Sequence, residues 1–391
     1  MKDQTIHIIG AGPAGLTAAI NLAKAGYATV VHEKQDDVGK RFNGDFQGVE
    51  NWSTKEDALA FLERHGLNIN FLCAPQYNGT FYDARPVEFS VRSQRPLFYL
   101  IERGNGVTSF DQGLKQQAMQ AGVQFKWKET VTEMPAERTI VSTGPKAADI
   151  IAQGIVFKTS HPNGYYGFLD DRIAPKGYAY LLVNESKATF ATCMFEDFRN
   201  SQTYFERALD RLKQTVDIDI RDAKPFGGFG NFFLPTTSTG ENRTALYVGE
   251  SAGYQDALWG FGIRYAVLSG YLAAQSMIHG LDYDRLVEEY ILPLQKISLA
   301  NRFLFDRSGN RSRQYLLNRL SKSDDVQGIL QKQHRLTPFK RLLFAVAKRW
   351  YHTRLIDKNC LHENCDCIWC RCGKQEETQK NDAEKNLPVY Q

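Results

Sequence analysis

The sequence lacks long hydrophobic runs. In its 391 residues no uninterrupted apolar stretch approaches the roughly 20 residues that a membrane-spanning helix needs. The first apolar stretch is broken by glycines, so it does not have the form of a secretory signal peptide. Because neither a span nor an export signal is found, we expect a cytoplasmic protein.

Cysteine is scarce over most of the chain. Five of the seven cysteines fall between Cys360 and Cys372, whereas a disulfide framework would distribute them through the fold. The composition is not that of a disordered or collagen-like chain either. With 42% hydrophobic residues, the chain can bury a core large enough for two packed domains and an extension.

A glycine fingerprint lies near the start. Residues 6–33 have the pattern of a strand, a tight turn, a helix and a second strand, with Gly10, Gly12 and Gly15 in G-x-G-x-x-G spacing. Such glycines make the turn, admit a pyrophosphate to the backbone and let helix and strand pack closely, and an acid after the second strand binds a ribose. The alternative is a glycine-rich turn in an ordinary βαβ unit. The pattern predicts dinucleotide binding at Gly10, Gly12, Ala14, Gly15 and Glu33.

A second nucleotide-binding region is expected late in the chain. Residues 245–253 have the pattern of an apolar strand running into a glycine turn with Glu250, and helical spacing starts at Ile263. A strand, an acid in the turn and a helix start make a second place for phosphates and a ribityl chain. Two such places favour FAD threaded through one domain over NAD held by one βαβ half. Arg41, in the loop after Glu33, is placed to meet a phosphate or the isoalloxazine edge, or else is a solvated surface arginine.

The rest of the chain alternates between strand-like and helical patterns. Residues 109–122 have helical spacing, with Phe110, Leu114, Ala118 and Met119 on one face. We predict an α/β fold with a Rossmann-type FAD-binding domain, an inserted antiparallel-sheet substrate domain and a helical C-terminal extension. The expected bounds are 1–75, 102–150 and 225–280 for the FAD-binding domain, 76–101 and 151–224 for the substrate domain, 281–358 for a basic helical region, and 359–391 for a Cys-rich tail with a disordered end.

Several segments together resemble a known family. The fingerprint with Glu33, LIERGNGVTSFDQGLKQQAMQAG at 100–122, TIVSTGP at 139–145, and VGESAG at 248–253 followed by WGFGIRYAVLSGYLAA are similar to the FAD-dependent geranylgeranyl reductases of the hydroxybenzoate hydroxylase superfamily. The resemblance covers residues 6–278 in the same order. It implies FAD contacts at Arg103, Gly144, Glu250, Gly260, Gly262 and Ile263.

The sequence departs from the family pattern at three places. Glu250 stands where the family usually has Asp, which keeps the chemistry with a longer reach. Ser-Thr-Gly-Pro at 142–145 replaces the superfamily's D-G motif, which is associated with NAD(P)H. The family's substrate-lining Y-x-W-x-F segment is matched loosely by YAYLL at 178–182. Tyr178 and Tyr180 alternate on a predicted strand, so both can face one cavity, where a phenol would donate a proton or shape the pocket; the alternative is packing within the sheet.

Two activities are open to such a flavin site. In the leading prediction, reduced FAD delivers a hydride to a carbon–carbon double bond of an isoprenoid or other lipid-like substrate at the membrane surface. The alternative is a flavin-dependent monooxygenase that hydroxylates an aromatic or polyketide-like small molecule. In either case NAD(P)H or a ferredoxin-like protein would supply the electrons.

The C-terminal region carries the positive charge. The net charge is only +4, yet residues 301–358 hold 14 Lys and Arg against 4 Asp and Glu. Residues 335–354 combine apolar side chains at helical spacing with basic ones, which favours a helix lying on anionic headgroups at the inner face of the membrane. The alternative is a helix packed on its own domain. Nucleic-acid binding is disfavoured, because no aromatic-interleaved basic groove or known reading motif accompanies the charge.

The tail is dense in soft metal ligands. Its cysteines would suit zinc or an iron–sulfur cluster, although their spacing is not that of a zinc ribbon. Zinc is favoured over a cluster that feeds electrons to FAD, and a metal-free, redox-sensitive tail is the third interpretation. The candidate ligands are Cys360, Cys365, Cys367, Cys370 and Cys372.

Overall fold

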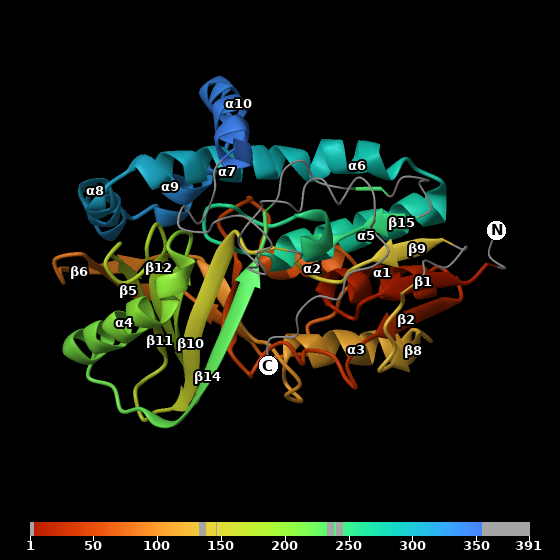
Figure 1. Ribbon diagram of the computed structural model, residues 1–391, viewed down its shortest axis with the longest axis horizontal. Helices are drawn as coiled ribbons and strands as arrows, with labels where there is room; N and C mark the ends of the chain where they lie inside the picture. The colour runs from red at the N-terminus through yellow and green to blue at the C-terminus, as the bar shows by residue number, and fades with distance from the viewer. Residues whose placement is uncertain (1–3, 133–137, 146, 233–237, 240–244, 354–391) are drawn as a thin grey trace.

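The computed structural model describes residues 4–132, 138–145, 147–232, 238–239 and 245–353 (Figure 1). A five-stranded parallel sheet has the order β15-β9-β1-β2-β8. Its central strands are almost fully buried, as expected for a parallel sheet between layers. The strands are β1 (Ile6–Ile9), β2 (Thr29–Glu33), β8 (Gln124–Trp127), β9 (Thr139–Val141) and β15 (Ala245–Tyr247).

Three helices pack beside this sheet. α1 (Pro13–Lys24) packs against both α3 (Phe110–Gln120) and α5 (Ile263–His279). All three contribute to one apolar core with β1 and β9. The prediction that Met119 shares the buried face of α3 is wrong, because this side chain is 57% exposed. Gln117 is buried instead, where its amide donates to the Asn68 carbonyl.

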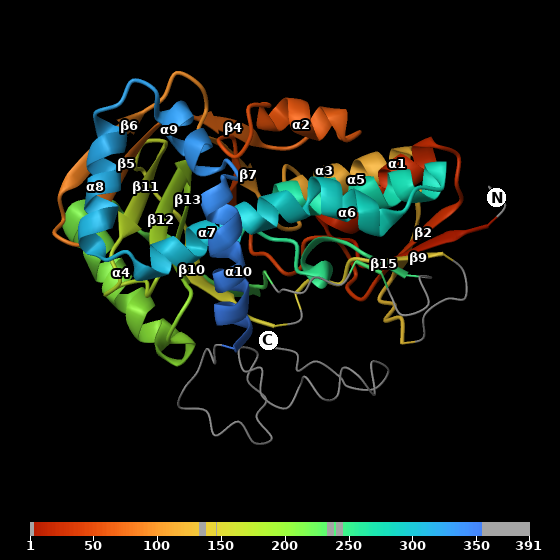
Figure 2. The ribbon, with the colours of Figure 1, turned by 90° about the horizontal axis from the view of Figure 1, so that it is seen from above.

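A seven-stranded sheet forms the second body of the molecule (Figure 2). Its order is β14-β10-β13-β12-β11-β5-β6, and every pair is antiparallel except β5 with β11. α4 (Ser201–Thr215) packs on β10 and β13. The strands are β5 (Asn78–Asp83), β6 (Glu88–Arg92), β10 (Ile150–Lys158), β11 (Gly164–Leu169), β12 (Tyr178–Asn184), β13 (Lys187–Met194) and β14 (Arg221–Gly230).

A three-stranded sheet has the order β3-β7-β4. Its strands are β3 (Phe46–Glu50), β4 (Cys73–Gln76) and β7 (Phe98–Glu102), and α2 (Ala58–Arg64) lies between β3 and β4 in the chain. The expected domain bounds stay a prediction; β14 crosses the expected bound between residues 224 and 225.

The chain then forms a run of helices along one face of the molecule (Figures 1 and 2). Arg302 of α7 anchors this layer, because its buried guanidinium donates to the carbonyls of Leu258 and Lys176 and lies 4.0 Å from the centre of the Phe195 ring. None of the described helices is both long and apolar enough to cross a membrane. The predicted α/β fold class, with its parallel sheet, antiparallel sheet and C-terminal helices, is confirmed. The helices are α6 (Tyr283–Tyr290), α7 (Leu292–Arg307), α8 (Asn310–Ser321), α9 (Val326–Gln333) and α10 (Pro338–Thr353).

Candidate cofactor and active site

The glycine turn joins β1 to α1. Gly10 has a φ of +100°, and a Cβ there would lie 2.3 Å from the backbone oxygen of Ser142. A Cβ on Gly15 would lie 2.3 Å from the Gly10 oxygen. The Gly15 N–H donates to the Ser142 hydroxyl at 3.0 Å, so the turn is fixed against the end of β9. Hydrogen is therefore the largest group that fits at Gly10 and Gly15.

Two helix starts meet near this turn. α1 begins after Gly12 and α5 begins after Gly262, and neither helix has a side-chain cap or an acidic residue in its first turn. A Cβ on Gly249 would lie 3.1 Å from the Cβ of Ala14 and 3.9 Å from Ala266, so the first turns of both helices lie at Gly249. Uncapped N–H groups carry partial positive charge and bind phosphate groups well. The predicted residues Gly12, Ala14, Gly262 and Ile263 are thus brought together.

Glu33 lies at the end of β2, beside the glycine turn. Its Oε2 accepts a hydrogen bond from the Ala11 N–H at 2.8 Å, and its Oε1 accepts one from Gln35 at 3.0 Å. These bonds fix the carboxylate while each oxygen keeps a lone pair. The carboxylate can therefore accept hydrogen bonds from a hydroxyl pair, as its position in the fingerprint predicts.

Arg41 and Glu250 form an ion pair across 209 residues of sequence. Nη1 of Arg41 lies 3.0 Å from Oε2 of Glu250, and the guanidinium also donates to the Phe229 carbonyl. A Cβ on Gly144 would lie 3.7 Å from Arg41, and one on Gly262 would lie 4.0 Å from Glu250. The arginine is partly exposed, but it is not a free surface group. The structure thus brings together four residues that were predicted to contact FAD, namely Arg41, Gly144, Glu250 and Gly262.

Arg103 is buried beside the loop that contains Phe42. Its Nε and Nη2 donate to the two carboxylate oxygens of Asp111 at 2.9 and 3.0 Å, and Nη1 donates to Gln47 at 3.2 Å. The guanidinium lies 4.0 Å from the centre of the Phe42 ring. Burial lowers the pKa of Arg103, but the carboxylates of Asp111, Asp45 and Glu250 together raise it more, so the group stays charged. Direct contact between Arg103 and FAD remains a prediction from the resemblance.

Gly260 completes the turn before α5. It has a φ of +79°, its N–H donates to the Asp256 carbonyl at 3.0 Å, and its own carbonyl accepts from the Gln255 amide at 2.9 Å. A Cβ there would lie 2.7 Å from the side chain of Ile150. The turn therefore presses against β10, the strand that carries Ile150.

The two candidate tyrosines lie on one face of β12. The ring centres of Tyr178 and Tyr180 are 6.1 Å apart. The Tyr178 hydroxyl donates to the Trp259 carbonyl at 2.6 Å, directly before the Gly260 turn. Burial raises the pKa of both phenols well above the ordinary value, so both stay protonated near neutral pH. The Tyr180 hydroxyl has no hydrogen-bond partner within the described part of the chain.

Sequence reasoning missed Glu50, at the end of β3. It is only 5% exposed, and its Oε2 has no hydrogen-bond partner among the described residues. Burial raises the pKa of Glu50 to about 7, although Arg264, whose Nε lies 4.0 Å from Oε1, acts in the opposite direction. Nothing in the local sequence distinguishes Glu50 from a surface acid, because Arg264 is 214 residues away.

The cysteines fall into two groups. The tail cysteines Cys360–Cys372 lie outside the described residues. Within the described ranges, no group of three His, Cys, Asp or Glu side chains could hold a metal ion. Cys73 and Cys193 are free, and burial raises the pKa of each thiol to about 12, so neither is a ready nucleophile.

Comparison with known sequences identifies similar proteins. A model of an NAD(P)-binding Rossmann-like domain matches residues 8–49. A digeranylgeranylglycerophospholipid reductase of Methanococcus vannielii is 22% identical over 74% of this chain and 80% of its own length. A protein of the same name from Haloferax volcanii is 25% identical over 88% of this chain and 98% of its own.

Solved structures share the fold. A geranylgeranyl bacteriochlorophyll reductase-like protein from Thermoplasma acidophilum has a TM-score of 0.65 at 17% identity, with 89% of this chain and 97% of that chain covered. The flavin-dependent brominase Bmp2 has a TM-score of 0.63 at 13% identity, with coverage of 89% and 99%. A p-nitrophenol 4-monooxygenase from Pseudomonas putida has a TM-score of 0.56 at 14% identity, with coverage of 85% and 100%. The predicted resemblance is confirmed, because the chain is similar to two proteins named digeranylgeranylglycerophospholipid reductase and shares the fold of a geranylgeranyl bacteriochlorophyll reductase-like protein.

Proposed function

We propose that this protein is an FAD-dependent oxidoreductase that reduces carbon–carbon double bonds of an isoprenoid or other lipid-like substrate at a membrane surface. The observation that carries the proposal is the meeting of two uncapped helix starts, an anchored carboxylate and glycines that exclude side chains. The names of the two curated relatives support the same reaction class.

The described residues fit FAD. The first turns of α1 and α5 would hold the pyrophosphate, and Glu33 would bind the ribose of the adenosine half. Arg41 and Glu250 would meet the ribityl chain or a phosphate, by exchanging part of their ion pair for contacts to the cofactor. Bound FAD, once reduced, supplies a hydride for the substrate double bond.

Reduction of a double bond also needs a proton. Tyr180 is the better candidate donor, because its hydroxyl has no hydrogen-bond partner among the described residues. The Tyr178 hydroxyl is already bonded to the Trp259 carbonyl, so Tyr178 would shape the cavity wall. Each reduced double bond would gain one hydride and one proton, and the two electrons would come from one NAD(P)H or from two equivalents of a reduced ferredoxin-like protein.

Monooxygenation is the second candidate, favoured by the fold shared with the monooxygenase and the brominase. The two reactions differ in their need for oxygen. The protein would be loaded with FAD, reduced anaerobically and mixed with a geranylgeranylated glycerolipid. The reductase predicts oxidation of the flavin without oxygen and a product heavier by two hydrogens per reduced bond. A product formed only in air, carrying an oxygen atom from O₂, would favour the monooxygenase.

The tail is assigned from its sequence alone. We propose that Cys360, Cys365, Cys367, Cys370 and Cys372 bind zinc, with an iron–sulfur cluster as the alternative. Metal analysis of the anaerobically purified protein tests this directly. Stoichiometric zinc would support it, iron with sulfide would favour an electron-transfer cluster, and the lack of both would reject a metal site.

A further inference from the structure

Exposed apolar side chains concentrate at the C-terminal helices. Twelve large hydrophobic side chains are exposed in the described part of the chain, and six of them lie between residues 304 and 350. Four belong to α10, where Phe339 is 62%, Leu342 71%, Val346 52% and Trp350 48% exposed. Spacings of three and four residues place these four on one stripe of the helix.

A different stripe of α10 attaches the helix to the protein. Ala347 is fully buried, and Leu343, Phe344 and Tyr351 pack with it against a core that includes Leu299 and Phe303 of α7. The Tyr351 hydroxyl also donates to the Asp306 carboxylate. Trp350 contacts Phe303 and Arg307 at the edge of this interface. Packing on α7 therefore accounts for one stripe and leaves Phe339, Leu342 and Val346 facing solvent.

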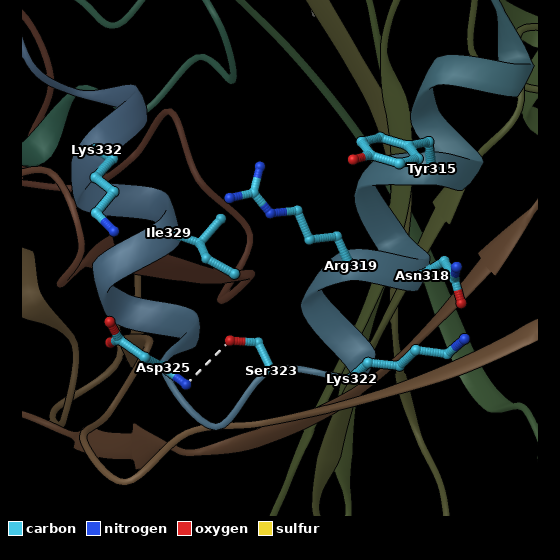
Figure 3. Close-up of a pocket in the computed structure, with 8 residues that line it drawn as sticks. All are labelled: Tyr315, Asn318, Arg319, Lys322, Ser323, Asp325, Ile329 and Lys332. Carbon is cyan, nitrogen blue, oxygen red and sulfur yellow. Dashed lines mark hydrogen bonds between the residues drawn. The ribbon is translucent and has the colours of Figure 1, made fainter.

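Positive charge is concentrated in the C-terminal helices, although the free cations of α10 lie on the side of the helix away from the exposed stripe. Arg341 and Lys348 are exposed on α10 and form no ion pair within the described part of the chain. Between α8 and α9, an open pocket of about 560 Å³ is lined by Arg319, Lys322 and Lys332 (Figure 3). Residues 301–353 hold 12 Lys and Arg against 3 Asp and no Glu. This balance complements an anionic surface.

We propose that α10 docks the protein on an anionic lipid bilayer. Phe339, Leu342 and Val346 enter the interface between headgroups and acyl chains, and the excess of positive charge in residues 301–353 attracts the protein to anionic headgroups. The proposal rests on the proposed function in one respect, since an enzyme that reduces a lipid has to reach its substrate at the membrane. The docking step itself involves neither FAD nor substrate, so it can be tested without either.

Flotation of the full-length protein with vesicles tests the proposal. The vesicles are phosphatidylcholine with phosphatidylglycerol, and phosphatidylcholine alone. We expect flotation with the anionic vesicles, weakened by high salt because surface charge attraction is screened. The triple variant F339S/L342S/V346S is expected to bind at least about tenfold more weakly. The matched control V107S/M119S/L281S removes three other exposed apolar side chains and should float like the wild type.

The remaining outcomes identify other occupants of the stripe. A wild-type dimer that becomes a monomer in the F339S/L342S/V346S variant, without flotation, would show that a second copy covers α10 and would overturn the proposal. A wild-type protein that is monomeric and does not float would also overturn the proposal, and would indicate that another segment of the same chain covers the stripe. Reduction of a detergent-solubilised substrate by a protein that does not float would reject docking while leaving the proposed reaction intact.

Discussion

The substitution Arg103→Gln is expected to destabilise the protein strongly. It removes the partner of Asp111, which is only 1% exposed and would keep a negative charge with the Gly104 N–H as its remaining strong donor. Removing one partner of a buried ion pair typically costs about 3–5 kcal/mol, because the other charge is left uncompensated. The loop containing Gly104 presses against Gly39, where a Cβ would lie 2.3 Å from the Gly104 oxygen. The loop around Gly39, which follows Glu33 in the chain, should therefore be disturbed as well, and FAD affinity should fall.

The matched control is Arg64→Gln. Arg64 makes a two-point contact with Glu56 that is shorter still, at 2.7 Å for each bond, but its side chain is 60% exposed. Solvent screening limits such a pair to about 0–1 kcal/mol. The measurement is urea unfolding of the FAD-free proteins, followed by fluorescence. A loss below about 1 kcal/mol for Arg103→Gln, or equal losses for both variants, would refute the view that burial makes the Arg103–Asp111 pair a structural support of the site.

Three further substitutions test other parts of the site. Gly15→Ala should weaken FAD binding at least about tenfold in a flavin fluorescence titration, because the new Cβ overlaps the backbone oxygen of Gly10. The control Gly228→Ala should leave FAD affinity unchanged, because a Cβ there meets nothing within 4 Å. Glu50→Gln should remove a pH dependence of the free energy of unfolding. The pKa of Glu50 is about 7 in the folded protein against 4.5 ordinarily, so Glu50 holds its proton more tightly when the protein is folded. The free energy of unfolding of the wild type should therefore fall by about 3 kcal/mol as the pH rises from 4.5 through 7. Equal slopes for the two proteins in urea midpoints across that range would contradict this. Tyr180→Phe should slow anaerobic substrate reduction by about 10²-fold without changing the flavin spectrum, whereas Tyr178→Phe should mainly lower stability; the reverse result would exchange their roles.

Local patterns account for what the sequence predicted well. The glycine turn and Glu33 lie within 28 residues, and each residue type there answers a geometric need that the immediate backbone creates. The amphipathic helices followed in the same way from apolar spacing. Met119 shows the limit of that reasoning, because it lies beside Ala118 in sequence but a helix turns by about 100° between neighbouring residues. A side chain next to a buried one is therefore not on its face.

Long-range contacts account for what the sequence could not show. The raised pKa of Glu50 depends on burial and on Arg264, and the placement of Arg41 depends on Glu250 and Phe229. Each of these partners is more than 180 residues away, and no local periodicity encodes such a pairing. The resemblance gave Glu250 and Arg103 roles toward FAD, but only the structure shows which protein groups already occupy part of their hydrogen-bonding capacity.

The helix α10 shows how a single pattern can fit two interpretations at once. Its apolar residues were compatible with membrane contact or with packing on the protein, because Leu342 and Leu343 are chemically identical and a one-dimensional pattern cannot say which is covered. In the folded chain they separate, with Leu343 toward α7 and Leu342 toward solvent. At about 1.5 Å per residue, the 16 residues of α10 span roughly 24 Å, too short and too charged to cross a bilayer but suited to lying along its surface. If α10 docks as proposed, packing on α7 fixes the angle at which the protein meets the membrane, and the two interpretations then apply to two sides of the same helix.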